Sequence, residues 1–481
     1  MNNDAKFEIF NQLYNAKFGL EPTQIVKLPP SGSYREYYRL GHGTNTAIAA
    51  YNEDVKENEA FIYLTKHFYS LGLPVPELYG ENLSKHSYLL EDLSDEMLLS
   101  FLEEHNYECN ISPEIMGVYK AALEQLPRFQ VTGTKHLDYS VCYPRHAFDR
   151  QSMMWDLNYF KYYFLKLAKV PFNEQLLEDD FQTFTDFLLS ADCNYFLYRD
   201  FQTRNIMLKN GNPYFIDYQG GRKGALHYDI GSILFEAKTN LPADAREELL
   251  EHYIVSLQKY VDISRDKFLE HYYGYVYIRM MQAMGAYGFR GLYEKKPLFL
   301  QSIPLVLNHL EWLVNNVKLP VELPELTKVW NTLVQSDYLR NMAKAHFSLI
   351  VNINSFSYKR GIPVDESSNG GGFVFDCRAM NNPGKLELYK NLTGKDPEVI
   401  SFLDAEPETV LFLNDIYSLI DRNVNKYLER GFTQLMVNFG CTGGQHRSVY
   451  AAEKLRQHLL AKFPEKNVIL ALRHREQEMN R

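Results

Sequence analysis

The chain has 481 residues, of which 45% are hydrophobic and 23% charged, a composition that excludes a disordered chain and allows two or three domains with cores of their own. A formal charge of −9 disfavours nucleic-acid binding by the chain as a whole, because affinity for a polyanion depends on Lys and Arg that neutralise phosphates. Five cysteines without Cys-x-x-Cys spacing argue against a disulfide scaffold.

The charge is unevenly distributed along the chain. Residues 341–481 carry 18 basic against 16 acidic residues, a balance of +2 that leaves −11 for residues 1–340. Any polyanion-binding surface is therefore expected toward the C-terminal end. No apolar run approaches the roughly 20 residues that span a bilayer, and the first residues lack an apolar signal region. These features predict a cytoplasmic protein without membrane contact.

The first hundred residues read as strands and one helix. Alternating or apolar segments at 34–40, 47–51 and 88–93 predict strands. Residues 55–68 predict a helix with one apolar face, which the Gly and Pro residues at 71–76 end. From 112 to 312 the pattern is mostly helical, broken by short strand-like pieces at 195–198, 206–208 and 214–216. A small β-rich lobe before a large helical lobe predicts an α+β bilobal, kinase-like fold.

A Pro-spaced stretch at 318–324 separates this region from a second one. A helix at 325–334 is assigned to the first domain, so we expect the first domain over residues 1–337 and a second over 341–481. The second alternates strands with helices and predicts a separate α/β domain. Its expected strands are 347–353, 373–376, 435–439 and 468–472, and its expected helices are 397–403, 410–429 and 448–462.

Three polar residues in the first domain have the spacing of a phosphoryl-transfer site. Asp200 is followed five residues later by Asn205, and Asp217 ends an apolar strand after a hairpin-like separation. Asp200 is the expected catalytic residue near the acceptor hydroxyl, while Asn205 and Asp217 are expected to hold Mg²⁺. Each residue alone is more often a turn residue or a helix cap. The joint pattern behind a β-rich lobe favours a kinase site.

The expected ATP-binding residues lie in the β-rich lobe. Gly32, Ser33 and Tyr34 belong to a short loop that is expected to close over the nucleotide, its glycine letting backbone approach the phosphates, although an ordinary hairpin turn is the alternative. Glu59 on the following helix is a candidate partner for a phosphate-binding lysine. Glu91 and Leu93, where a strand leaves into a polar stretch, complete the predicted set.

The motifs at 196–207, 215–220 and 228–231 resemble those of the aminoglycoside phosphotransferase superfamily, over approximately residues 10–335. With Gln282 and the segment 285–290, the chain looks most like the branch of cell-wall sugar kinases typified by AmgK. The resemblance implies phosphorylation of N-acetylmuramate and N-acetylglucosamine at the anomeric hydroxyl with ATP and Mg²⁺. Tyr198 stands where the superfamily usually has His, and no Lys occupies the strand at 47–51. Lys56 is a candidate substitute, or this branch dispenses with the lysine.

The second domain contains a predicted phosphate-binding loop between an apolar strand and a helix. Cys441 and Arg447 have Cys-x5-Arg spacing, with which backbone amides and a guanidinium surround an oxyanion. The following helix adds its N-terminal dipole. Such a loop binds phosphate, and its thiolate is also a potential nucleophile. The predicted residues are Cys441, Thr442, Gly443, Gly444, Gln445, His446, Arg447 and Ser448.

This second unit resembles the RapZ C-terminal domain over about residues 345–475. The matching segments are 355–363, 375–378, 382–383, 392–396, 440–450 and 473–475. The resemblance implies that the loop binds a sugar phosphate, and that Arg378 and His474 line the site. The tail at 476–480 lacks the basic run of that family, which argues against an RNA partner.

The leading hypothesis is an ATP-dependent kinase for an N-acetylated amino sugar in cell-wall sugar salvage, joined to a domain that binds a sugar phosphate. Two alternatives remain open. One is a regulatory binding protein with a silent kinase fold that acts as an RNase-adapter-like protein, and the other is a Cys-dependent sugar phosphatase at Cys441. The identity of the sugar, the choice of ATP or GTP and the oligomeric state are left open.

Overall fold

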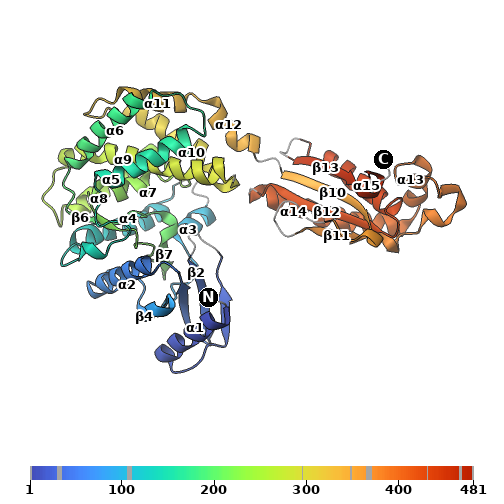
Figure 1. The fold of residues 1–481 in the computed structure, drawn as a ribbon, viewed down its shortest axis with the longest axis horizontal. Helices are drawn as coiled ribbons and strands as arrows, with labels where there is room; N and C mark the ends of the chain where they lie inside the picture. Colours follow the sequence, from blue (N-terminus) through green and yellow to red (C-terminus); the bar gives the residue numbers. More distant parts are fainter. Residues whose placement is uncertain are drawn as a thin grey trace. The chain divides into compact units, whose positions relative to one another are not determined.

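The computed structural model describes residues 3–29, 35–105, 111–294, 296–346, 349–363, 371–430, 432–464 and 468–478. The chain divides into two compact units (Figure 1). The first comprises Met1–Glu294 and Ser302–Ser336, and the second comprises Lys295–Gln301 and Asp337–Arg481. In the described ranges, no helix has the length and apolar character needed to cross a bilayer.

The first unit begins with a five-stranded antiparallel sheet in the order β1-β2-β3-β5-β4. Helix α1 packs on one face of this sheet (Figure 1), where Phe10 and Tyr14 are fully buried against strand residues such as Leu40. The strands predicted at 34–40, 47–51 and 88–93 correspond to β2, β3 and β5, whereas α1, β1 and β4 were not predicted. The bounds are α1 (Asn3–Phe18), β1 (Gln24–Lys27), β2 (Glu36–His42), β3 (Asn45–Tyr51), β4 (Leu78–Asn82) and β5 (Ser87–Glu91).

Helix α2 (Val55–Ser70) follows the third strand and confirms the helix predicted there. The Asp54 carboxylate caps it by accepting from the Glu57 amide at 3.2 Å. Phe61, Leu64 and Phe68 are buried on its inner face. Phe68 also packs edge-on against Phe196 of the helical lobe, at a centroid distance of 5.0 Å. Helix α2 therefore joins the small lobe to the strands that carry the predicted catalytic residues.

The helical lobe surrounds two short antiparallel ribbons, β6 (Tyr195–Leu197) with β9 (Arg222–Gly224) and β7 (Ile206–Lys209) with β8 (Asn212–Phe215). Strands β6, β7 and β8 match the strand-like pieces expected inside the helical region, whereas β9 was not predicted. The lobe's helices are α3 (Leu98–Glu104), α4 (Pro113–Pro127), α5 (Arg150–Phe160), α6 (Glu174–Leu189), α7 (His227–Leu234), α8 (Ala243–Leu257), α9 (Arg265–Tyr287), α10 (Pro297–Asn316) and α11 (Pro324–Val334).

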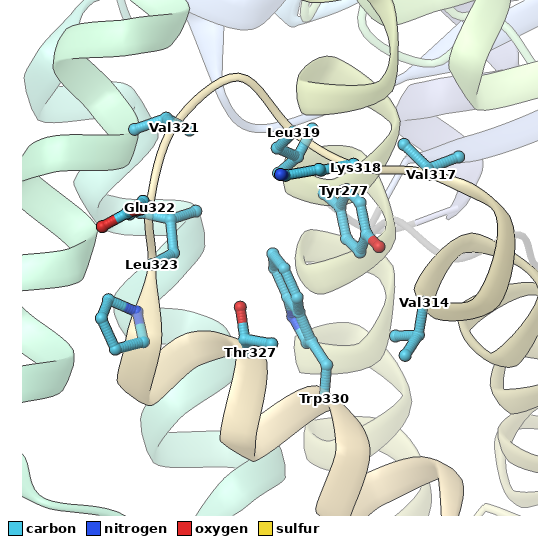
Figure 2. Close-up of a pocket in the computed structure, with 11 residues that line it drawn as sticks. Tyr277, Val314, Val317, Lys318, Leu319, Val321, Glu322, Leu323, Thr327 and Trp330 are labelled. Atoms are coloured by element: carbon cyan, nitrogen blue, oxygen red, sulfur yellow. The ribbon is translucent and has the colours of Figure 1, made fainter.

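Helix α11 is hydrogen-bonded to helix α6 of this lobe, because the Asp180 carboxylate accepts from the Leu326 amide at 2.8 Å. The Pro-spaced stretch before it bounds a hollow of about 510 Å³ (Figure 2). There Trp330 stacks on Tyr277 with a centroid distance of 4.1 Å, and the rim at Lys318 comes from the linking loop. Residues 318–323 of this stretch are therefore a loop of the first unit, and Pro324 begins α11.

The second unit starts with α12 (Asp337–His346) and contains a parallel sheet in the order β11-β12-β10-β13 (Figure 1). The odd-numbered residues Leu349, Val351 and Ile353 turn toward the helices, whereas Asn354 hydrogen-bonds to Asn438 on the other face. The elements are β10 (Leu349–Ser357), β11 (Phe373–Asp376), α13 (Pro397–Asp404), α14 (Pro407–Glu429), β12 (Gln434–Cys441), α15 (Arg447–Lys462), β13 (Val468–His474) and α16 (Arg475–Glu478).

The predicted fold class is thus confirmed. A kinase-like unit with an antiparallel small-lobe sheet and a helical lobe precedes a parallel α/β unit. In the parallel sheet, Ser357 pairs with Cys441, Asp376 with Gly440 and Ser355 with His474. Because the carboxyl ends of parallel strands share one edge, these residues gather where ligands commonly bind in such sheets.

Candidate functional sites

The structure brings the three predicted phosphoryl-transfer residues together. The Asn205 side-chain amide donates to the Asp200 carbonyl oxygen at 2.8 Å and to Asp217 Oδ2 at 3.3 Å. Asp200 follows β6, Asn205 immediately precedes β7, and Asp217 follows β8, so the two ribbons position all three. A Cβ atom placed on Gly220 would lie 3.4 Å from Asp200 Oδ2, so the turn after Asp217 packs beside the Asp200 carboxylate.

A carboxylate of helix α7 binds the backbone just before Asp200. The buried Asp229 carboxylate accepts from the amides of Tyr198 and Arg199 at 2.8 and 2.9 Å. Burial raises the pKa of Asp229 to about 7. Arg199 itself has a left-handed φ of +81°, which a non-glycine residue adopts only when its surroundings enforce it. Asp229 supplies that enforcement through two backbone hydrogen bonds.

Tyr198 stands at the position where the resemblance predicts a histidine. Its ring is fully buried, and its hydroxyl donates to the carbonyl oxygen of Ile216 at 2.6 Å. Ile216 immediately precedes Asp217. Tyr198 therefore links the two segments that carry Asp200 and Asp217 through a hydrogen bond.

The carboxylate of Asp200 lies in an environment that disfavours its charged form. Burial and, secondly, the negative charge of Asp217 raise its pKa, while Arg199 and Arg279 oppose this increase. Its Oδ1 atom accepts a long hydrogen bond of 3.4 Å from Gln202. A carboxyl group with a raised pKa beside a second carboxylate is a common arrangement at catalytic sites.

The structure corrects the expectation for Glu59, whose side chain is exposed. The glutamate of α2 that faces the site is Glu57, because residues two apart on a helix point about 200° away from each other. Glu57 pairs with Arg35 at an N···O distance of 3.0 Å. Gln219 bridges to it, donating to Asp217 Oδ1 at 2.8 Å and approaching Glu57 Oε1 at 3.4 Å.

Arg35 is a buried cation near Glu57 that was not predicted from the sequence. It is 4% exposed, precedes β2, and lies over the Phe61 ring at 5.6 Å. Lys56, the candidate substitute for the missing lysine, is exposed. No local spacing connects Arg35 to Glu57, because their contact depends on how α2 packs on the sheet, so sequence reasoning missed this pair.

The remaining predicted ATP-binding residues have different outcomes. Gly32, Ser33 and Tyr34 lie outside the described residues. The Glu91 carboxylate binds Lys209 Nζ and accepts from the Glu77 amide at 3.1 Å, so its side chain is already paired. Leu93 is buried, at 5% exposure. The ATP-binding role of Glu91 and Leu93 stays a prediction.

In the second unit, the predicted phosphate-binding loop runs from the end of β12 to the start of α15. Cys441 Sγ accepts from the Gly444 amide at 3.2 Å and lies 3.1 Å from Ser448 Oγ. Gly444 has a left-handed φ of +70°. Within the described ranges, the amides of Gly443 and His446 donate to no protein acceptor, and the first amides of α15 have no acceptor inside the helix. The loop therefore has backbone donors for an oxyanion.

Arg447 is 6% exposed, and its guanidinium is partly committed to the protein. Nη1 donates to the carbonyl oxygens of Arg378 and Met380 at 2.8 and 2.9 Å, whereas the buried Nε has no partner among the described residues. Arg447 thus fixes the segment after β11 against the loop, and part of its guanidinium has no protein partner among the described residues.

Two predicted side chains tie the loop to its surroundings. Gln445 donates to the Leu392 carbonyl oxygen at 2.7 Å, and the His446 ring lies 2.9 Å from the Tyr389 carbonyl oxygen. Thr442 and Gly443 are exposed at the loop's outer side. The loop therefore offers mainly its backbone, its thiol and part of Arg447 to a ligand.

The structure corrects the expectation for His474. The ring is 6% exposed, with Nδ1 2.8 Å from Ser355 Oγ and Nε2 3.1 Å from Glu453 Oε1. Both ring nitrogens are therefore already used, and His474 supports the sheet edge instead of lining the site. Arg378 is exposed, pairs with Asp376 and lies over the Tyr358 ring at 4.3 Å, and its ligand-binding role stays a prediction.

Sequence reasoning missed two residues beneath the loop. Ser357 Oγ donates to the Thr442 carbonyl oxygen at 2.6 Å, and the Ser357 amide donates to Glu476 Oε1 at 3.2 Å. Glu476 in turn pairs with Arg360 and Arg475. Ser357 lies in the segment 355–363 that matches the RapZ family, so a signal for it was present, whereas the position of Glu476 depends on α16.

Comparisons with known proteins match each unit to a family model. Residues 26–267, half of the chain, match the family model described as phosphotransferase enzyme family. The chain belongs to this phosphotransferase enzyme family. Residues 349–478 match the model described as RapZ C-terminal domain.

Individual relatives and solved structures match parts of the chain. A nucleotide-binding protein of Nitrosomonas eutropha is 46% identical over 110 residues, 23% of this chain and 36% of that protein. The chain spans about a third of the length of such curated relatives. Among solved structures, a choline kinase from Cryptosporidium parvum covers 69% of this chain and all of its own, with a TM-score of 0.47 and 10% identity. An ADP-bound aminoglycoside phosphotransferase covers 71% of this chain and 99% of its own, with a TM-score of 0.42 and 11% identity.

The chain's own residues fit a magnesium ion bound together with a nucleotide. The described residues contain no cluster of three or more His, Cys, Asp and Glu that would hold a metal alone. Asn205 and Asp217 offer amide and carboxylate oxygens, which are hard ligands of the kind that Mg²⁺ prefers, and nucleotide phosphates and water usually complete its shell. This donor set is sufficient for a metal that arrives with its nucleotide.

Proposed function

We propose that residues 1–337 form a kinase domain that transfers a phosphoryl group from ATP to a hydroxyl group of an N-acetylated amino sugar. We propose further that residues 341–481 form a domain that binds a sugar phosphate. The observation that carries the first proposal is the convergence of Asp200, Asn205 and Asp217 through the Asn205 amide. The motifs that resemble the AmgK branch support an amino sugar with its anomeric hydroxyl as acceptor, in cell-wall sugar salvage.

In this proposal each residue acts through a feature already described. Asp200 orients the acceptor hydroxyl and takes its proton. Asn205 and Asp217 would hold the magnesium ion, which supplies positive charge near the phosphates. Gln219, Glu57 and Arg35 form a chain of contacts that fixes Asp217 and ends in a buried cation. The protein's contribution is therefore positioning and electrostatic stabilisation, which is most of what phosphoryl transfer requires.

The direct test is nucleotide turnover with a panel of acceptors. The protein is incubated with ATP, Mg²⁺ and N-acetylmuramate, N-acetylglucosamine or N-acetylgalactosamine, and ADP release is compared with that of the Asp200→Asn variant. We expect at least one sugar to stimulate ADP release only in the wild type. Equal rates for both proteins on all three sugars would contradict the proposal and favour a silent kinase fold.

The second domain's proposed ligand is a sugar phosphate held by backbone amides and by Arg447. A Cys-dependent phosphatase is the second candidate, because Cys441 Sγ accepts the Gly444 amide in the centre of the loop. The two candidates are distinguished by whether the bound sugar phosphate is hydrolysed. Release of inorganic phosphate from glucosamine 6-phosphate, lost in Cys441→Ser and kept in Asp200→Asn, favours the phosphatase. Binding without release favours the proposed sensor-like domain.

Gly444 offers a specific test of the loop. A Cβ atom there would lie 2.3 Å from Glu476 Cγ and 3.0 Å from the Ser357 amide nitrogen, at a φ of +70°. We expect Gly444→Ala to distort the loop and to abolish the thermal stabilisation that glucosamine 6-phosphate gives to the second unit. Gly443→Ala is the matched control, since a Cβ atom there meets nothing within 4 Å. Equal ligand-induced shifts in both variants would rule out this loop as the binding site.

A further inference from the structure

Arg222 is a buried cation beside the proposed catalytic centre. Its side chain is 6% exposed, and Nε and Nη2 both donate to the Gly220 carbonyl oxygen at 3.0 Å. Within the described part of the chain, no carboxylate forms an ion pair with it, and Nη1 has no hydrogen-bond partner. Burial and, secondly, the charge of Arg199 lower its pKa to about 10. A buried guanidinium without a counter-charge is costly unless an anion joins it.

Arg222 lies close to Asp200 through two structural links. In the β6–β9 ribbon it pairs with Leu197, three residues before Asp200. Gly220, whose carbonyl oxygen it binds, packs beside the Asp200 carboxylate. The groups that act most strongly on Arg222 are Arg199, Asp156, Tyr228 and Asp200, and Asp217 is not among them. Arg222 is therefore associated with the acceptor residue Asp200 more than with the proposed metal ligands.

A second guanidinium acts on the same carboxylate from α9. Arg279 Nε donates to Ser232 Oγ at 2.9 Å, and Nη1 donates to Gln282 Oε1 at 2.8 Å. Its positive charge opposes the rise in pKa that burial causes at Asp200 and at Tyr228. Across the ranges that the structure describes, Arg279 also forms no ion pair with a carboxylate. Two cations from different elements thus act on Asp200 without a direct ion pair to a carboxylate among the described residues.

The neighbouring carboxylates form no ion pair with these two cations in the described ranges, because each is bound elsewhere. Asp156 forms a two-point pair with Arg199 at 2.7 and 2.8 Å. Asp229 accepts the backbone amides of Tyr198 and Arg199. Glu236 accepts the Thr203 amide at 2.9 Å. Within the described residues, Arg222 and Arg279 therefore carry positive charge without an ion-pair partner near Asp200, where the acceptor would lie.

We propose that the acceptor carries an anionic group, either a carboxylate or a phosphate, and that Arg222 and Arg279 bind it. This inference rests on the proposed kinase function and names the class of its substrate. Planar guanidinium groups bind such oxyanions with directed, charge-assisted hydrogen bonds. A site built in this way rejects an acceptor that lacks the anion, because its buried donors are then left unpaired.

A matched set of acceptors tests this inference. N-acetylglucosamine is neutral, N-acetylmuramate adds a carboxylate to the same ring, and N-acetylglucosamine 6-phosphate adds a phosphate, so the set also distinguishes the two anions. We expect kcat/KM to be about 10- to 100-fold higher for one anionic acceptor than for the neutral sugar. Arg222→Gln should remove this preference mainly by raising KM for that acceptor, and Arg222→Lys should restore part of it.

The controls separate this inference from the proposed function. Lys223→Gln changes the adjacent residue of β9, whose side chain lies on the opposite face of the ribbon, and should keep the preference. Arg279→Gln gives a second variant if Arg222→Gln does not fold. Equal use of neutral and anionic sugars, or a raised KM for ATP instead of the acceptor, would overturn the inference while leaving the kinase intact.

If no acceptor is turned over, the proposed function is at fault and binding still tests the inference. Thermal shifts of the Asp200→Asn protein are then measured with the same three sugars. Stabilisation by an anionic sugar that disappears in the Asp200→Asn, Arg222→Gln double variant supports the assignment. Shifts that are equal for all three sugars would overturn it.

Discussion

Replacing Asp200 with Asn is expected to lower phosphoryl transfer by about 10²–10⁴-fold, the usual contribution of a positioned proton acceptor. The two side chains have nearly the same shape, and the Asp200 carbonyl oxygen, not its carboxylate, accepts the strong hydrogen bond from Asn205. The loop should therefore keep its conformation while the group that orients the hydroxyl loses its charge. Steady-state ADP release with a saturating acceptor measures the effect.

The pH dependence of turnover gives an independent test of the same residue. Asp200 must be ionised to accept a proton, and burial with the charge of Asp217 raises its pKa above the ordinary 3.8. A raised carboxyl pKa means that the protonated, inactive form persists to higher pH. We therefore expect kcat/KM to fall as pH decreases through that raised pKa in the wild type.

A surface variant supplies the control for both measurements. Asp186 is exposed on α6 and pairs with Arg150, so Asp186→Asn changes the formal charge equally at a site without catalytic contacts. It should leave the rate and the pH profile unchanged. If Asp200→Asn retains more than about a tenth of wild-type turnover, Asp200 is not the proton acceptor.

The sequence was sufficient to single out candidate residues that lie close together along the chain. Asp200, Asn205 and Asp217 were predicted because they lie on consecutive loops of short ribbons, and the ribbons themselves follow from apolar runs. The same logic would have found helix α1, since Phe7, Phe10, Tyr14 and Phe18 recur every three or four residues. This helix was missed although its periodic signal is present.

The misassigned glutamate has a similar origin. The apolar face of α2 was recognised from Phe61, Leu64 and Phe68. Glu57 lies four residues before Phe61 and therefore on that face, whereas Glu59 does not. Applying the helical phase to the polar residues as well would have selected Glu57.

Other features depend on contacts between distant segments and have no local pattern. Arg35 contacts Glu57 only because α2 packs on the sheet. His474 lies within hydrogen-bond distance of Ser355 only because β10 and β13 pair in parallel with Ser355 opposite His474. Arg222 likewise gains its importance from burial in the folded lobe. Such roles follow from tertiary packing, so a single sequence cannot assign them.

Replacing Asp229 with Ala is expected to lower the free energy of unfolding of the first unit by about 2–5 kcal/mol. The variant leaves the amides of Tyr198 and Arg199 without their acceptor in a buried position, and each unpaired donor costs about 1–3 kcal/mol. Arg199 would also lose the bonds that hold its left-handed backbone, so turnover should fall together with stability. Chemical denaturation followed by circular dichroism measures the first effect, and ADP release the second.

The pH dependence of this stability distinguishes Asp229 from a residue that only fills space. Its pKa is about 7 in the folded protein against an ordinary value of 3.8, so between these values the folded state binds a proton that the unfolded state has lost. Stability therefore decreases as pH rises through this window, because the unfolded state binds fewer protons.

Asp229→Asn keeps one acceptor oxygen and has no titrating group, so it should lose less stability than Asp229→Ala. Both variants should lose this part of the pH dependence. A wild type and an Asp229→Asn protein with identical slopes between pH 4 and 7 would show that Asp229 does not titrate there, and its carboxylate would then hold the catalytic loop in its charged form throughout.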